Sequence, residues 1–173
     1  MKRIAALILA LCLVCSLVGC EKKTEKSTQT TTAAPEQEIS MFDLSRAMLG
    51  AATFGEMRYI SSADDYAEDK FSYVSDLDYG KVEAFFLAYA ADGKGNADEI
   101  AVIRVKDAQD VNAAMVSLQN HLQKRVALYQ TYDPSQSEKL GKGSVFTDGR
   151  FAVLIVSDDN HAVRSAFEAF LNK

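Results

Sequence analysis

The sequence predicts an α+β fold in two layers, with helices packed on one face of an antiparallel sheet of about four strands. Apolar segments of strand length occur twice as adjacent pairs, 82–90 with 99–106 and 144–148 with 151–156, and each pair is joined by a turn that contains glycine. A segment with helical spacing of apolar residues follows each pair. The expected order is therefore β-β-α-β-β-α after an N-terminal helix.

The N-terminal part of the domain is less regular. Asp43 is a candidate N-cap, and Leu44, Ala47 and Met48 follow at helical spacing, which predicts a short amphipathic helix that begins near Met41. The region 54–79 mixes aromatic and acidic residues without a clear period. We expect irregular structure there, with a short helix near residues 65–71.

The later helices have clear sequence boundaries. Asp107 is placed to cap a long helix, and Pro134 is expected to end it because proline disfavours helical backbone in the residue before it. In the last helix, Asp158 or Asp159 is expected to serve as the N-cap.

The chain divides into three parts. Residues 1–19 have a positive start followed by an apolar run, which is typical of a signal peptide, and the run is too short for a usual transmembrane helix of ~20 apolar residues. Residues 20–40 are mostly polar, with many Thr and Ser side chains, and predict a flexible linker. Residues 41–173 form the single predicted α+β domain.

The last residues of the apolar run match the lipobox pattern of bacterial lipoproteins: Leu17, Val18 and Gly19 precede Cys20. A thiolate is nucleophilic enough to take up a lipid as a thioether. Cleavage before Cys20 would make this lipidated cysteine the first residue of the mature chain. An ordinary secretory signal with a chance cysteine is the alternative.

Charge and cysteine content limit the partners. The formal net charge is -5, so a basic surface for nucleic acid is not expected. Two of the three cysteines lie inside the predicted leader, which leaves Cys20 alone in the mature chain and gives no pair for a disulfide. We expect no cofactor.

Three motifs invite a functional reading that their details do not support. The segment 92–98 resembles a calcium loop but has Lys94 where an acid is needed. The segment 141–144 has the Gly-Lys pair of a phosphate loop but lacks its other required positions. The segment 157–161 holds Ser, Asp and His, for which helix capping is the simpler explanation. We therefore expect no catalytic or metal site, and two separated histidines, His121 and His161, do not indicate zinc.

The lipobox, the Thr-rich linker and the stretches 97–102 and 152–159 together resemble a family of small lipoproteins from Gram-positive bacteria that carry a domain of unknown function. The resemblance spans residues 43–171. It implies an α+β domain held at the cell membrane on its extracytoplasmic face, and it implies no reaction.

The sequence favours a noncatalytic binding or accessory module, anchored to the membrane through Cys20 and partnered by an envelope protein. Two alternatives stay open. One is an envelope hydrolase that uses the acids between Asp64 and Asp78, since paired carboxylates can divide the acid and base roles. The other is an inhibitor or chaperone-like domain for a neighbouring envelope enzyme.

Overall fold

The computed structural model describes residues 39–92 and 95–172, which belong to one unit spanning Gln37–Lys173. The signal peptide, the lipobox and almost all of the predicted linker lie outside the described residues. Helices, short 3-10 turns and strands alternate in the order α1 (Met41–Leu49), β1 (Met57–Ser61), α2 (Ala67–Phe71), η1 (Tyr79–Lys81), β2 (Val82–Ala90), β3 (Glu99–Val105), η2 (Ala108–Asp110), α3 (Val111–Tyr132), α4 (Pro134–Gly141), β4 (Ser144–Asp148), β5 (Phe151–Val156) and α5 (Asn160–Leu171).

The five strands form one antiparallel sheet in the order β1-β2-β3-β5-β4. The two hairpins, β2 with β3 and β4 with β5, pair side by side because β3 and β5 are neighbours at the centre. Every residue of β3 and of β5 is buried. A strand buried on both faces needs apolar residues at successive positions, and β5 has the sequence Phe-Ala-Val-Leu-Ile-Val.

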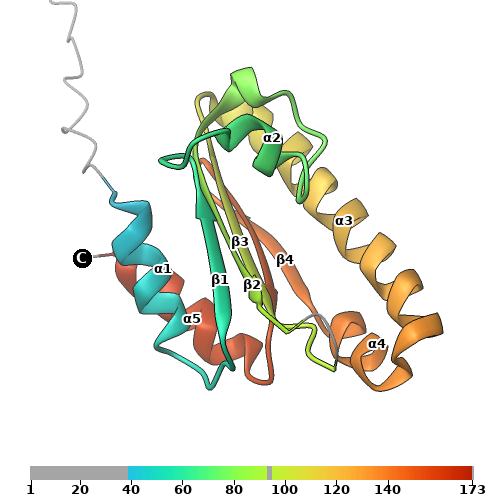
Figure 1. Cartoon of the computed structure of the whole chain (residues 1–173). Coiled ribbons are helices and arrows are strands. Elements are labelled where there is room, and N and C mark those ends of the chain that lie inside the picture. The colour runs from blue at the N-terminus through green and yellow to red at the C-terminus, as the bar shows by residue number, and fades with distance from the viewer. Residues whose placement is uncertain (1–38, 93–94, 173) are drawn as a thin grey trace, which may run out of the picture. The chain divides into compact units, whose positions relative to one another are not determined.

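Helices cover both faces of this sheet (Figure 1), with α3 and α4 on one side and α1 and α5 on the other. Alternate residues of β3 separate the two layers: Ala101 and Ile103 face α3, whereas Ile100 and Val102 face α1 and α5. The domain therefore has two apolar cores, one on each side of the sheet.

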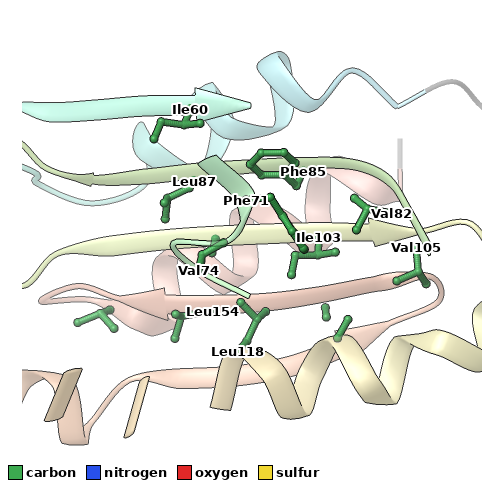
Figure 2. Packing of buried hydrophobic residues seen from close by; sticks show 14 of the residues in the cluster. Ile60, Phe71, Val74, Val82, Phe85, Leu87, Ile103, Val105, Leu118 and Leu154 are labelled. Atoms are coloured by element: carbon green, nitrogen blue, oxygen red, sulfur yellow. The ribbon is translucent and has the colours of Figure 1, made fainter. Parts of the chain in front are cut away.

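The core beneath α3 joins several elements. Figure 2 shows Phe71, the last residue of α2, and Val74, just after it, packed with residues of the strands, and Leu118 of α3 beside Leu154 of β5. Phe71 and Phe85 have ring centroids 5.1 Å apart in an edge-to-face arrangement. These contacts hold the segment 71–79 close to α3 and the sheet.

The α+β class, the antiparallel sheet and the packed helices are confirmed, and two details differ. The sheet has five strands instead of four, because β1 adds a short edge strand in the region predicted to be irregular. Helices cover both faces instead of one. The uninterrupted apolar sequence of β5 is the physical reason, since a solvent-exposed face would carry polar residues at alternate positions.

Most predicted helix boundaries are close to the observed ones, but some caps differ. Ser40, not Asp43, caps α1, and its hydroxyl accepts a hydrogen bond from the Asp43 N–H at 3.2 Å. Asp107 precedes a 3-10 turn, so α3 begins only at Val111. Pro134 follows the end of α3 as predicted and is also the first residue of α4, a position that suits its fixed backbone angle. Asp159 caps α5 as predicted.

Candidate functional site

The polar cluster with the most deeply buried charge joins β3 to α3. Glu99 is the first residue of β3, and its position in the strand places it on the same face as Ala101 and Ile103, toward α3. His121 and Arg125 are four residues apart on α3 and so share one face of that helix. The docking of α3 against the sheet brings the three side chains together.

Both oxygens of the Glu99 carboxylate have cationic or polar partners. His121 Nε2 lies 2.8 Å from Oε1, and Arg125 Nη1 donates to Oε2. The Glu99 side chain is 3% exposed, whereas those of His121 and Arg125 are each 18% exposed. A buried carboxylate loses the solvation of water, so these two partners are what make its charge tolerable.

Arg125 is held from several sides. Its Nη1 also donates to the carbonyl oxygen of Ala97 at 3.4 Å, and its guanidinium lies 5.5 Å from the ring centroid of Tyr129. Contact with an aromatic face orients the guanidinium plane. The cluster of Glu99, His121 and Arg125, which we term the charged triad, is therefore preorganised.

A pocket of about 260 Å³ opens over the charged triad. Tyr73, Leu87 and Tyr89 form the rest of its wall. Tyr89 is partly buried and Leu87 is buried, but the Tyr73 side chain is 69% exposed. The pocket thus combines a polar floor with aromatic and aliphatic walls, which is the usual composition of a small-ligand site.

A second polar cluster lies along α3 and fixes the segment after α2. Ser117 Oγ donates to Asp76 Oδ1 at 2.5 Å and accepts from the Asp76 N–H at 2.8 Å, and Ser75 Oγ lies 2.8 Å from Ser117 Oγ. The hydrogen bond from Ser117 lowers the pKa of the Asp76 carboxyl below its ordinary value of 3.8. An ionised carboxylate without a histidine beside it does not activate a serine, so this cluster serves to hold residues 75–77 on α3.

A third charged group lies at the same end of the sheet as the charged triad, beside the start of β3 and the end of β5. Lys139 of α4 lies 2.5 Å from the buried Asp98 carboxylate and 3.0 Å from Asp158. Burial opposes the charge of the Lys139 ammonium, but its contacts with the two carboxylates outweigh burial and raise its pKa above the ordinary value. The Asp98 of the calcium-like segment therefore pairs with a lysine.

Among the acids between Asp64 and Asp78, two cap local turns and two share an open pocket. Asp64 accepts from the Ser61 N–H at 2.6 Å, and Asp78 accepts from the Gly80 N–H at 2.9 Å, so both cap local turns. Asp76 and Asp78 do line one open pocket of about 570 Å³, together with Lys81. Asp76 is held ionised by Ser117, which is the wrong state for a general acid.

The remaining sequence candidates have structural positions. In the segment 157–161, Ser157 donates both its backbone N–H and its hydroxyl to the side-chain oxygen of Asn160, at 2.8 Å and 3.0 Å. The hydrogen-bond partner of the serine is therefore an amide and not a catalytic group. His161 is exposed, while His121 belongs to the charged triad. Within residues 39–92 and 95–172, no three His, Cys, Asp or Glu side chains gather as they would around a metal ion.

Cys20 and its lipobox, Leu17, Val18 and Gly19, lie outside the described residues. No helix in the described part of the chain is both long and apolar enough to span a membrane. The anchor therefore remains a prediction from the sequence.

Sequence reasoning missed Glu99 and Arg125. A glutamate at the start of an otherwise apolar strand was the available signal, together with His121 at the edge of the apolar stripe of the long helix. These two signals lie more than twenty residues apart, and only the packing of α3 on β3 connects them.

A model of the protein family described as "Domain of unknown function (DUF4358)" matches residues 60–157. The match begins near the end of β1 and runs just past β5, so it includes the charged triad and leaves out α1 and α5. It is narrower than the span 43–171 expected from the resemblance. No curated protein and no solved structure matches the chain.

Proposed function

The chain belongs to the DUF4358 family of unknown function, and from that premise we propose that it is a lipid-anchored, noncatalytic binding module on the outer face of the bacterial cell membrane. In this proposal, Cys20 carries the lipid, the linker spaces the domain from the membrane, and the pocket over the charged triad holds the ligand. The ligand belongs to the cell envelope, either as a protein partner or as another envelope component.

The observation that carries the binding function is the pocket itself. A buried carboxylate paired with two cationic or polar side chains is costly to fold, and an apolar replacement of similar volume is often as stable or more stable. Here the charged triad lies at the floor of a pocket whose wall includes the largely exposed Tyr73. Polar groups placed at the floor of an apolar-walled pocket fix the orientation of a ligand.

The same geometry favours binding over catalysis. Each Glu99 oxygen already has one partner, His121 or Arg125, and the described residues that line the pocket include no serine, cysteine or lysine that would serve as a nucleophile. A group that must exchange a proton during a reaction needs access to the reacting atom. The charged triad supplies fixed hydrogen-bonding groups instead.

The anchor is tested by metabolic labelling with a fatty-acid analogue in cells that produce the full chain or its Cys20→Ala variant. The proposal predicts a labelled protein in the membrane fraction that starts at residue 20, and a Cys20→Ala variant that carries no label. A protein that keeps its leader, or a mature chain whose first residue has no added acyl mass, would contradict the anchor.

The binding role is tested by chemical crosslinking in intact cells followed by capture of the tagged chain. We expect an adduct that is lost with Tyr73→Ala and kept with His161→Ala, because both side chains are exposed but only Tyr73 borders the pocket. Equal adducts from both variants would place the binding surface elsewhere.

A further inference from the structure

We infer that the pocket over the charged triad takes a neutral sugar ring, such as a unit of an envelope glycan. This inference rests on the proposed function, since it names the chemical class of the ligand that the binding pocket would hold. Three features of the pocket lead to it: the charge of its floor, the hydrogen-bonding groups that line it, and the nature of its walls.

The charge of the floor favours a neutral ligand. Glu99 and Arg125 compensate each other at contact distance inside a mostly buried cluster. An anionic ligand would meet the Glu99 carboxylate, and a cationic ligand would compete with Arg125 and His121 for it. Like charges brought together in a site of low dielectric cost more than they do in water.

The hydrogen-bonding groups favour a ligand that both donates and accepts. A carboxylate offers about four acceptor sites, and a guanidinium has five N–H donors. The two Glu99 oxygens each have one partner in the charged triad, so acceptor capacity remains on the side of Glu99 that lines the pocket. A hydroxyl group donates and accepts at once, so neighbouring sugar hydroxyls can donate to Glu99 and accept from Arg125.

A purely apolar ligand fits the floor poorly. It would exclude water from the charged triad without replacing the hydrogen bonds that water makes, and an unsatisfied buried polar group costs about 1–3 kcal/mol or more if it is charged. The polar floor therefore selects against a simple aliphatic or aromatic side chain as the occupant.

The walls suit the C–H face of a sugar ring. Tyr73 and Tyr89 provide aromatic surface, and Leu87 adds an aliphatic contact. Tyrosine offers a large, rigid and amphipathic contact area at a low cost in side-chain entropy. The volume of about 260 Å³ lies below the range of about 300–1,000 Å³ that is usual for drug-sized ligands, which agrees with one ring and not with a folded segment.

The test is saturation-transfer NMR on the purified Cys20→Ala protein. The probes are the methyl glycosides of glucose, galactose and N-acetylglucosamine, with glucuronate as an anionic ring and glucosamine as a cationic ring. We expect at least one neutral glycoside to bind about tenfold more tightly than either charged ring.

Two variants locate the bound sugar. Tyr73→Ala removes part of the wall and is expected to weaken binding by about tenfold, whereas Tyr132→Ala removes another largely exposed tyrosine, outside the pocket, and leaves binding unchanged. Since Tyr73 and Tyr132 are both exposed, neither substitution is expected to unfold the protein, and a circular-dichroism spectrum checks this.

The sugar inference is overturned if no neutral glycoside gives a signal at millimolar concentration, or if glucuronate or glucosamine binds as tightly as the neutral rings. If the cellular adduct still depends on Tyr73 in that case, the pocket binds a ligand of another class, such as a neutral peptide segment, and the proposed function stands. If neither the adduct nor the sugar signal depends on Tyr73, both proposals fail.

Discussion

Replacement of Arg125 by methionine tests whether the charged triad is the energetic centre of the α3 face. Methionine keeps most of the length of the arginine side chain and removes its charge. The Glu99 carboxylate would then be left with His121 as its main partner while its side chain stays 3% exposed. Breaking a buried ion pair by removing one partner leaves an uncompensated charge inside the protein.

The expected loss follows from this burial. Removal of one partner from a buried pair destabilises a protein by ~3–5 kcal/mol. Since the Arg125 side chain is 18% exposed and His121 keeps its contact, the lower end of that range applies. We expect Arg125→Met to reduce the free energy of unfolding by about 3 kcal/mol.

The double variant Glu99→Leu with Arg125→Met provides an internal check, because it leaves no buried charge at this position. Apolar replacement of a whole buried ion pair is often neutral or stabilising, so the double variant is expected to lie within about 1 kcal/mol of the wild type. The two substitutions are thus strongly non-additive, as contacting residues usually are.

Urea unfolding followed by circular dichroism measures these differences, with the slope of the unfolding free energy against urea compared between variants. Lys142→Met is the matched control, because its ion pair with Glu138 is exposed on both sides, at 71% and 74%, and such a pair contributes about 0–1 kcal/mol. The reasoning is refuted if Arg125→Met costs no more than Lys142→Met.

Three further predictions test the fold and its electrostatics. Phe167→Ala in α5 is expected to cost about 3–5 kcal/mol in urea unfolding, because the side chain is fully buried on the face of the sheet opposite α3. A loss below about 1 kcal/mol would argue against the second helical layer. Gly143→Ala is expected to cost about 1–3 kcal/mol in urea unfolding, because its added Cβ would lie 2.9 Å from a backbone oxygen. The control Gly141→Ala, whose Cβ would have nothing within 4 Å, should be neutral or slightly stabilising. Equal stabilities of the two variants would refute the close approach at Gly143. Ser117→Ala removes the hydrogen bond that lowers the pKa of the Asp76 carboxyl. The wild type therefore gains stability from this bond above pH 3.8 and loses that gain as the pH falls through the lowered pKa. A difference in stability between the two proteins that does not narrow in acid would contradict this pH dependence.

Local patterns were sufficient to predict the second hairpin. Its strands, Ser144–Asp148 and Phe151–Val156, agree with the ranges expected from the sequence. Gly149 in the turn has a φ of 52°, a left-handed conformation that two-residue hairpin turns require and that glycine adopts without steric cost. A short-range signal of this kind does not depend on the rest of the fold.

Features that depend on tertiary packing could not be predicted. The strand Met57–Ser61 contains Arg58 and Ser61 and lies at the edge of the sheet, so its sequence lacks a strong strand pattern. The number of helical layers was also missed, although the apolar run in β5 is typical of a strand covered on both faces.

The charged triad shows the same limit at the level of the site. Glu99 lies on a strand, and its partners lie on a helix that begins twelve residues later. Their meeting depends on the angle and register at which α3 packs on the sheet. Periodicity predicted the helix and placed His121 at the edge of its apolar stripe, but periodicity within one helix does not identify a partner on a distant strand.

Site-specific photo-crosslinking in intact cells tests the proposed binding module most directly. A benzophenone amino acid is placed at Tyr73 beside the pocket or, as a control, at the exposed His161 on α5. We predict a crosslinked adduct at position 73 in the membrane fraction and none at position 161. No adduct at position 73 above the level at position 161 would contradict the claim that this pocket is where the anchored protein binds.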